Sequence, residues 1–324
     1  MQPVLIEGST LSKSIYHCTH VPAETWIKYA QALLSLAHMG RTPSLQEIDW
    51  FQNEWISTID PSHNQAFAEA IAQLSPLSDI SSLLPQIVFP TQLDVKRVLL
   101  FDNIRMIRQN PNYHKIEKEN LQTISKYLQI PMYLAKTIDG IVSTEFSLRS
   151  LKRSIFEFDS NHALKLNPGE KALGFAVRET LGIFSMTEEM QYYYGCALMV
   201  IAGSDGLVSE AERNWFIKTL VRDAQFSDEV VEKIKNFNYI GVNLFQYLEK
   251  FSTYKSVNIA RTLLYNAIKM AMADGDYADE EKNAVAKSGK LLNIPSHIVH
   301  TMEYLISTEL SLERMRKTIF QIKD

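Results

Sequence analysis

The sequence predicts an all-α protein made of two homologous helical-bundle domains. Segments separated by 164 or 165 residues align with one another along most of the chain. Apolar residues recur at the three- and four-residue spacing that places them on one face of a helix. No segment keeps the apolar–polar alternation of a half-buried strand for more than a few positions. These observations favour helices packed as small bundles with short connections.

The repeat is clearest toward the end of each half. The segment SLRSLKRSIF (147–156) aligns with SLERMRKTIF (311–320) at an offset of 164. The alignment continues without a gap back to RVLLFDNIRMI (97–107), which lies on RTLLYNAIKMA (261–271). About a third of roughly sixty aligned positions are identical. A similarity of this extent indicates that one half of the chain is a copy of the other.

The front of each half aligns as well, at an offset of 165. Here ALLSLAHMGRTPSLQEIDWF (32–51) matches ALMVIAGSDGLVSEAERNWF (197–216). The polar stretch DSNHALKLNPGEK contains an Asn-Pro-Gly turn signal and marks the junction between the copies. We therefore expect a first domain at 1–158, a linker at 159–168 and a second domain at 169–324.

Each domain is expected to hold two pseudo-symmetric helix–turn–helix units. In the third unit of the chain, Ala197 and Ile201 recur at helical spacing before the turn SDGLVSEAE. In the fourth unit, Leu264, Ile268 and Ala271 do the same before DGDYADEE. The first domain carries the corresponding turns as HMGRTPSLQE and RQNPNYHKIE.

Composition narrows the class of protein. A net charge of −4 over 324 residues gives no basic arm for nucleic acid, so no nucleic-acid partner is expected. The start MQPVLIEGST lacks the pattern of a signal peptide, and the apolar run CALMVIAG is too short to insert into a membrane. Cys18 and Cys196 have neither disulfide nor metal spacing. We expect a cytoplasmic protein.

Two acidic turns are the candidate functional site. Both follow one frame, in which an Asp-Gly pair is followed by an acid five residues after the Asp and a Glu seven residues after it. The candidate metal ligands are Asp205, Glu210 and Glu212 in the third unit, and Asp274, Asp276, Asp279 and Glu281 in the fourth. An EF-hand is excluded, because the sixth and twelfth positions of the fourth turn are Asp279 and Val285 instead of Gly and Glu.

Part of this acidity has a structural explanation. Ser209 and Glu212 have the spacing of a capping box, which satisfies free amides at a helix start. The first domain keeps the same box as Ser44 and Glu47, so Glu212 alone is no evidence of a site. In the fourth unit Ala278 replaces the capping hydroxyl, which leaves Glu281 with a weaker structural explanation.

The aspartates are harder to explain structurally. Gly206 and Gly275 are expected as left-handed helix caps, and the residue before each is Asp. The first domain has Gly40 and Asn110 at those two positions, so the turns can be made without an acid. Two carboxylates 4 Å apart repel by about 4 kcal/mol at an effective dielectric constant near 20. Convergent turns would therefore favour a bound cation, and separate turns would be acidic surface; the residues leave both alternatives open.

The stretches MVIAGSDGLVSEAERNWF and KMAMADGDYADEEKNAV resemble the tellurite-resistance TerB-like family. The resemblance implies an all-helical domain of two helix pairs that binds a metal through the acids of its turns. It also implies a degenerate first domain kept for packing or binding, because that domain lacks both aspartates. Oxygen ligands of this kind suit a hard divalent cation such as Ca²⁺, Mg²⁺ or Mn²⁺.

Two functions from different classes follow. The first is a non-enzymatic metal-binding module of a bacterial stress-response system, acting with a protein partner. The alternative is a metal-independent helical scaffold for protein interaction, since the repeat persists in the first domain without its acids. Enzyme activity is not expected, because the sequence contains no phosphate loop, dinucleotide fingerprint or Gly-x-Ser-x-Gly motif.

Smaller clusters complete the sequence-based picture. His17, Cys18 and His20 lie together, as do His297 and His300, but neither group has the partners of a zinc site. A basic set recurs at the end of each half and is interpreted as a solvated helix face or a contact with an anionic partner or the other domain. Its members are Arg149, Lys152, Arg153, Arg314, Arg316 and Lys317.

Overall fold

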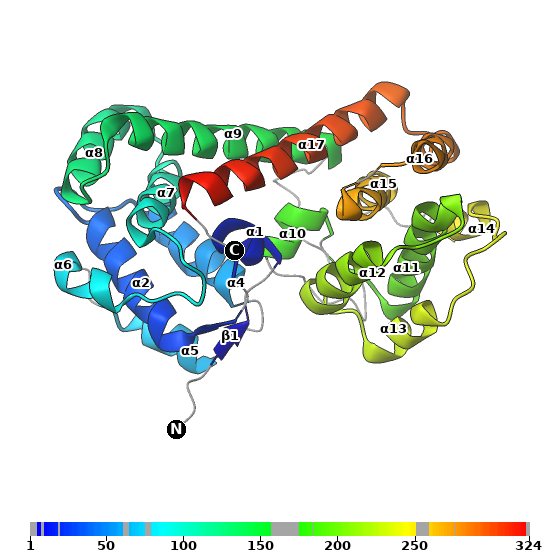
Figure 1. Ribbon diagram of the computed structural model, residues 1–324, viewed down its shortest axis with the longest axis horizontal. Helices are drawn as coiled ribbons and strands as arrows, with labels where there is room; N and C mark the ends of the chain where they lie inside the picture. Colours follow the sequence, from blue (N-terminus) through cyan, green and yellow to red (C-terminus); the bar gives the residue numbers. More distant parts are fainter. Residues whose placement is uncertain are drawn as a thin grey trace. The chain divides into compact units, whose positions relative to one another are not determined.

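The computed structural model describes most of the chain, and every structural statement below concerns those residues. The described residues are 5–7, 10–18, 20–60, 65–74, 79–156, 175–183, 185–250, 259–275 and 277–321. The all-α prediction is confirmed: helices dominate, and the strands described form one short antiparallel pair, β1 (Leu5–Glu7) with β2 (His20–Pro22) (Figure 1). Among the described residues no helix is long and apolar enough to cross a membrane.

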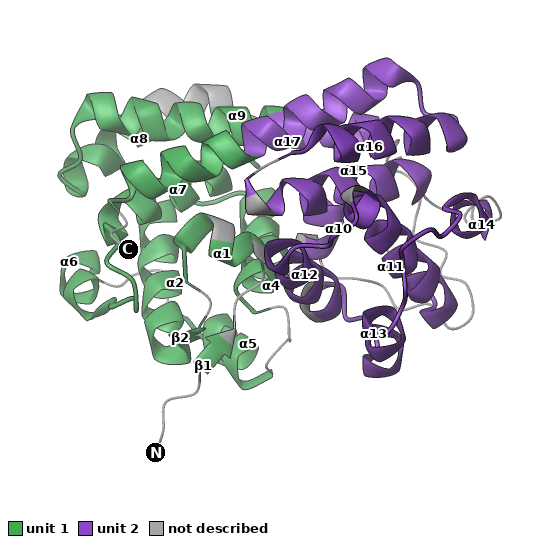
Figure 2. Cartoon of the chain, turned by 45° about the vertical axis from the view of Figure 1, so that its right-hand side comes forward, with its two compact units in different colours: residues 1–147, 310–324 green, residues 148–309 purple. Residues whose placement is uncertain are grey.

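The chain divides into two compact units (Figure 2). Unit 1 comprises residues 1–147 and 310–324, and unit 2 comprises residues 148–309. The predicted linker at 159–168 lies outside the described residues, and the predicted domain boundaries stay predictions. The units differ from the predicted domains at two helix ends. Residues 148–156, from the end of the predicted first domain, belong to unit 2, and residues 310–321, from the end of the predicted second domain, belong to unit 1.

Unit 1 contains the helix pairs of the first repeat. Its helices are α1 (Thr10–Tyr16), α2 (Ala23–Ala37), α3 (Leu45–Asp49), the π-helical η1 (Trp50–Trp55), α4 (Ile56–Ile59), α5 (Gln65–Ala72), α6 (Ile80–Leu83), the 3₁₀ turn η2 (Leu84–Gln86), α7 (Val95–Ile107), α8 (Tyr113–Tyr127), and the first part of α9 (Met132–Phe156). The end of α17 (Ser296–Ile319) also belongs to this unit.

The core of unit 1 surrounds one buried carboxylate. Oδ2 of Asp102, on α7, accepts hydrogen bonds from the hydroxyls of Tyr16 at 2.7 Å and Tyr29 at 2.8 Å. Its Oδ1 accepts from Arg105 at 3.2 Å. Because an unpaired buried charge is costly, these donors make a polar group tolerable at the centre of an aromatic cluster. The network joins α1, α2 and α7.

Unit 2 contains the helix pairs of the second repeat. Its helices are α10 (Phe175–Leu181), α11 (Glu188–Ala202), the 3₁₀ turn η3 (Gly203–Asp205), α12 (Glu210–Phe216), the π-helical η4 (Ile217–Asp223), α13 (Asp228–Lys235), α14 (Phe245–Leu248), α15 (Ile259–Ala271), the 3₁₀ turn η6 (Met272–Asp274) and α16 (Asp279–Leu291), together with the end of α9 and the first part of α17. At the position aligned with Asp102, the amide of Asn266 donates to Tyr194 Oη at 2.7 Å and to the carbonyl of Leu181 at 2.8 Å.

Both long helices begin in the same way. The helices before them, α8 and α16, end in residues with a left-handed backbone, Gln129 with φ 59° and Asn293 with φ 55°. The amide of the following isoleucine donates to the carbonyl five residues earlier over 2.8 Å in each case. A proline then starts the next helix, where its missing N–H costs nothing.

Each unit holds the end of a long helix from the other repeat. In unit 1 the Phe320 ring, beyond the end of α17, packs edge-on against Phe101 with centroids 5.3 Å apart. Arg97 donates to the carbonyl of Ile319 at 2.7 Å. Unit 2 has the same contacts at the aligned positions. Phe156 of α9 packs on Tyr265 at 5.1 Å, and an arginine of α15 donates to the carbonyl before that phenylalanine at 2.8 Å.

Two members of the basic set at the helix ends are buried in ion pairs. Lys152 pairs with Glu309 at 2.5 Å inside unit 2, and Arg316 pairs with Glu145 inside unit 1. Both basic residues are less than 10% exposed, at 7% and 6%. For these two residues the interpretation as a solvated face is wrong, because the aligned glutamates of the long helices provide internal partners.

Candidate functional site

The third helix pair turns through Gly206. The chain leaves α11 through η3, and Gly206 has a φ of 105°, as expected for a left-handed cap. Ser209 then caps α12, accepting at Oγ from the Glu212 amide at 3.2 Å. The Glu212 carboxylate accepts from the Ser209 amide at 2.6 Å. The predicted capping box is therefore confirmed, and it holds the Glu212 side chain in a buried position.

The fourth helix pair turns through Gly275 in the same way, with a φ of 90° between η6 and the start of α16. Ala278 stands where the capping hydroxyl would be. The Glu281 carboxylate still accepts from the Ala278 amide at 2.8 Å, so half of the capping arrangement survives. Glu281 is buried, like Glu212. Glu281 therefore has a capping role, as Glu212 does, but only through its own carboxylate, because Ala278 has no hydroxyl to complete the box.

The two acidic turns pack against each other crosswise within unit 2. The turn η3 contacts α16, and the turn η6 contacts α12. Ser204, in the third turn, donates from its hydroxyl to the carbonyl of Glu280 at the start of α16, over 3.5 Å. Each turn therefore lies beside the helix start that follows the other turn. The two glutamates buried at those helix starts belong to one region of the unit.

The other predicted ligands fall into two groups. Glu210 and Asp279 lie on exposed first turns of their helices, and Asp279 pairs with Lys282 at 3.0 Å. The side chains of Asp205 and Asp274, and all of Asp276, lie outside the described part of the structure. Among the side chains that are described, no group of three or more His, Cys, Asp or Glu residues could hold a metal ion.

The aligned glutamate of unit 1 is neutralised by an arginine. Glu47 accepts two hydrogen bonds from the Arg41 guanidinium, at 2.9 and 2.5 Å, and one from the Ser44 amide at 2.7 Å. Asn110, at the end of the second turn, donates to the same carboxylate at 3.0 Å. Burial alone would raise the pKa of Glu47, but the bonds from Arg41, Ser44 and Asn110 outweigh it and lower that pKa.

Sequence reasoning did not assign Arg41 a role, although the alignment contains the signal. At an offset of 165 Arg41 lies opposite Gly206, and at 164 Asn110 lies opposite Asp274. Unit 1 thus has a cation and a neutral donor where unit 2 has a glycine and an acid. The buried glutamate is the same in both units, and the residue types at these two aligned positions differ in charge.

Residues 195–303 match the family model described as tellurite resistance protein TerB. This segment is a TerB domain. It covers about a third of the chain, begins within α11 and ends within α17, so both acidic turns lie inside it. Neither a curated protein nor a solved structure matched the chain. The match does not extend into the first half, where the degenerate copy of the domain stays a prediction.

Proposed function

We propose that the TerB domain is a non-enzymatic binding module for a hard divalent cation. In this proposal the protein acts in the cytoplasm, within a stress-response system of the tellurite-resistance kind that the family description names. The cation would be held by carboxylates of the two acidic turns. These are Asp205, Glu210, Glu212, Asp274, Asp276, Asp279 and Glu281.

The crosswise packing of the two turns is the observation that carries this proposal. If the turns were distant, each would be an acidic loop whose charge water could screen. Because η3 lies against α16 and η6 against α12, the helix starts that carry Glu212 and Glu281 share one region of the domain. Carboxylates gathered at close range repel, by about 4 kcal/mol for a pair 4 Å apart at an effective dielectric near 20. A bound cation would offset that repulsion.

The comparison with unit 1 supports the same proposal. There the Arg41 guanidinium supplies a positive charge to buried Glu47, and Asn110 adds a neutral donor. The TerB domain has Gly206 and Asp274 at those positions, so it lacks the aligned arginine and has an additional acid. The additional acid at this turn favours an external cation. The donors are all oxygens, which favours Ca²⁺, Mg²⁺ or Mn²⁺ over softer metals.

Such a cation would tie the two helix pairs of the TerB domain together. Its ligands come from the turn of one pair and the helix start of the other, so occupancy would fix how the pairs pack. We propose that a protein partner recognises this metal-dependent arrangement. The family description supports the stress-response context.

Calorimetric titration of the chelator-treated full chain with Ca²⁺, Mg²⁺, Mn²⁺ and Zn²⁺ tests the proposal. We expect saturable binding of a hard cation, and loss of that binding in the Asp205→Asn/Asp274→Asn variant. The control is Glu229→Gln/Glu232→Gln, which removes the same charge from exposed residues of α13 in the same unit. Binding that is absent in the wild type, or reduced equally in both variants, would refute a site at the turns.

A second candidate function, a metal-independent interaction scaffold, is favoured for unit 1. The Arg41–Glu47 pair occupies the position where a cation would otherwise be needed. Unit 1 would then keep its fold and its binding surface at any metal concentration. The same titration distinguishes the functions, because a scaffold protein binds none of the four cations in either unit.

A further inference from the structure

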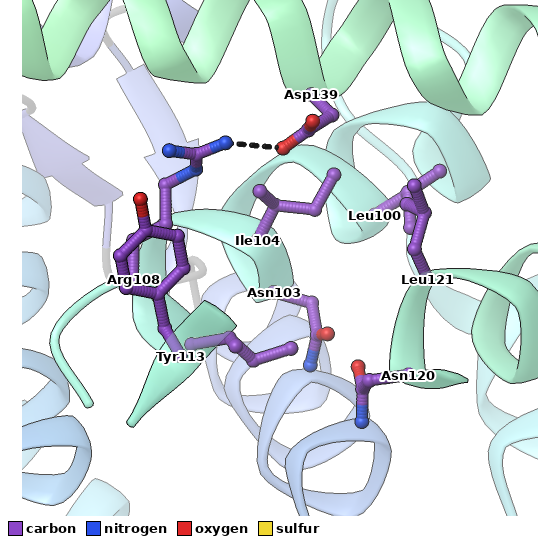
Figure 3. A pocket seen from close by; sticks show the side chains of 9 residues that line it. Leu100, Asn103, Ile104, Arg108, Tyr113, Asn120, Leu121 and Asp139 are labelled. Carbon is purple, nitrogen blue, oxygen red and sulfur yellow. Dashed lines mark hydrogen bonds and ion pairs between the residues drawn. The ribbon is translucent and has the colours of Figure 1, made fainter. Parts of the chain in front are cut away.

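A small cavity between α7 and α8 in unit 1 is lined by two asparagines from facing helices (Figure 3). Asn103 lies on α7 and is fully buried, and Asn120 lies on α8 and is 7% exposed. The cavity has a volume of about 10 Å³. Its other walls are mostly apolar, and the Arg108–Asp139 ion pair, with an N–O distance of 2.7 Å, lies at its edge.

Three buried polar atoms of the asparagines make no hydrogen bond to the protein. They are Oδ1 and Nδ2 of Asn103 and Oδ1 of Asn120. A buried polar group without a partner costs roughly 1–3 kcal/mol, so three of them would be a large fraction of a domain's stability. Native proteins satisfy such groups with a protein partner or with ordered water. The cavity must therefore hold something polar.

The second repeat indicates that the two asparagines act together. At an offset of 164, Asn103 aligns with Ala267 and Asn120 aligns with Ala284. Both positions thus carry an amide in one repeat and a methyl group in the other. A pair of alanines needs no polar group between them. A single asparagine facing an alanine would have no hydrogen-bonding partner at this place. The pair makes physical sense only if the two amides share a common ligand.

We propose that this cavity binds one ordered water molecule, which bridges Asn103 and Asn120. The volume decides the size of the ligand, because about 10 Å³ is close to the minimum that holds one water and excludes organic molecules. The bonding capacity decides its chemistry. The walls offer the NH2 group of Asn103 as a donor and two carbonyl oxygens as acceptors, and water can accept through its lone pairs and donate through two O–H groups. A cation could not accept from the Asn103 amide.

The water would form a cyclic pair of hydrogen bonds with the Asn103 amide and a single hydrogen bond to Asn120. Water accepts from Nδ2 of Asn103 and donates to Oδ1 of the same amide, and its second O–H donates to Oδ1 of Asn120. This satisfies all three atoms with three bonds, the usual number for an internal water. The ligand thereby links α7 to α8, the two helices of the second pair in unit 1.

Double-mutant analysis of the full chain tests the bridge. Asn103→Ala or Asn120→Ala alone leaves part of the polar set without a partner, and we expect each to lower the folding equilibrium constant of unit 1 about tenfold or more. The Asn103→Ala/Asn120→Ala variant reproduces the alanine pair of the second repeat. We expect it to be clearly more stable than the product of the two single effects. Strictly multiplicative losses would contradict a shared ligand.

The water itself is detected by NMR in protein labelled with ¹⁵N at asparagine. We expect a nuclear Overhauser effect between the Asn103 side-chain amide protons and a long-lived water, and its loss in Asn120→Ala. The control is Asn53, an exposed asparagine whose amide donates to Asp49 at 2.6 Å and should show only rapidly exchanging water. Finding no long-lived water at Asn103, or finding the two amides bonded directly to each other, would overturn the proposal.

Discussion

Replacing Arg41 by alanine should destabilise unit 1, because it leaves the buried carboxylate of Glu47 without its counter-charge. The Glu47 side chain has no exposed area, and the Arg41 side chain is 14% exposed. Removing one partner of a buried ion pair costs about 3–5 kcal/mol. Glu47 keeps its bonds from the Ser44 amide and from Asn110, so we expect the lower end of that range, about 3 kcal/mol.

The loss should depend on pH in a defined direction. In the wild type the folded-state pKa of Glu47 is lowered, so its contribution to stability is present above the unfolded pKa and disappears as the pH falls through the folded one. Without Arg41 burial becomes the dominant influence and raises that pKa. The variant is then penalised most at neutral pH, where Glu47 is charged. The difference in unfolding free energy between wild type and variant should shrink from pH 7 to pH 4.

Tryptophan fluorescence during urea unfolding measures this effect selectively. Trp26, Trp50 and Trp55 lie in unit 1, and a Trp215→Phe background removes the fourth tryptophan of the chain. With a urea slope of about 1.5–3 kcal/mol per molar, a loss of 3 kcal/mol lowers the midpoint by about 1–2 M.

The control for this prediction is Lys28→Ala, which breaks the exposed Lys28–Glu24 pair of α2 and should cost about 0.5 kcal/mol or less. An Arg41→Ala midpoint no lower than that of the control at pH 7 would refute the reasoning. So would a loss that stays the same at pH 4.

Three further predictions concern both units. The pKa of Glu309 is lowered to about 2 because the charges of neighbouring lysines outweigh its burial, so unit 2 should lose stability as the pH falls from about 4.5 to 2; Glu309→Gln should remove that dependence in thermal melts. Gly206→Ala should destabilise unit 2 by about 1–2 kcal/mol because of its left-handed backbone, measured by circular dichroism during urea unfolding. Gly140→Ala, inside α9 with open space around it, should stabilise unit 1 by up to about 1 kcal/mol in the tryptophan assay. Phe320→Ala should destabilise unit 1 by about 3–5 kcal/mol and lower the urea midpoint of the unit-1 tryptophan signal. Phe156→Ala should destabilise unit 2 and leave that midpoint unchanged, and the reverse pattern would contradict both assignments.

Local signals in the sequence were sufficient for the turns. A serine followed three residues later by a glutamate specifies a helix start, and Ser44 and Ser209 both form that box. A glycine after a helical run specifies a left-handed cap, and Gly206 and Gly275 both have positive φ. These features depend on the backbone within a few residues, so the pattern alone predicts them.

Contacts between distant residues could not be predicted in the same way. Lys152 and Arg316 have the spacing of a solvated helix face, and nothing nearby in the chain reveals their glutamate partners. Each partner lies in the unit that the helix end joins, and the sequence does not show which unit that is. The repeat did contain a hint, because Glu145 and Glu309 align with each other as the basic residues do.

The two halves of the chain solve one physical problem in two ways. Each has a glutamate that caps a helix and is buried where two turns meet, and a buried carboxylate needs compensating charge. In unit 1 the counter-charge is a residue of the chain itself, Arg41, so it is present under all conditions. In the TerB domain the aligned residue is Gly206, so this arginine is absent, and under the function proposed above a cation from solution would bind at the acidic turns. If the second unit binds a cation as proposed, the protein would respond to cation concentration there while the first unit keeps its structure. Under the function proposed above, the first half, which has Arg41 and lacks both aspartates, would need no metal.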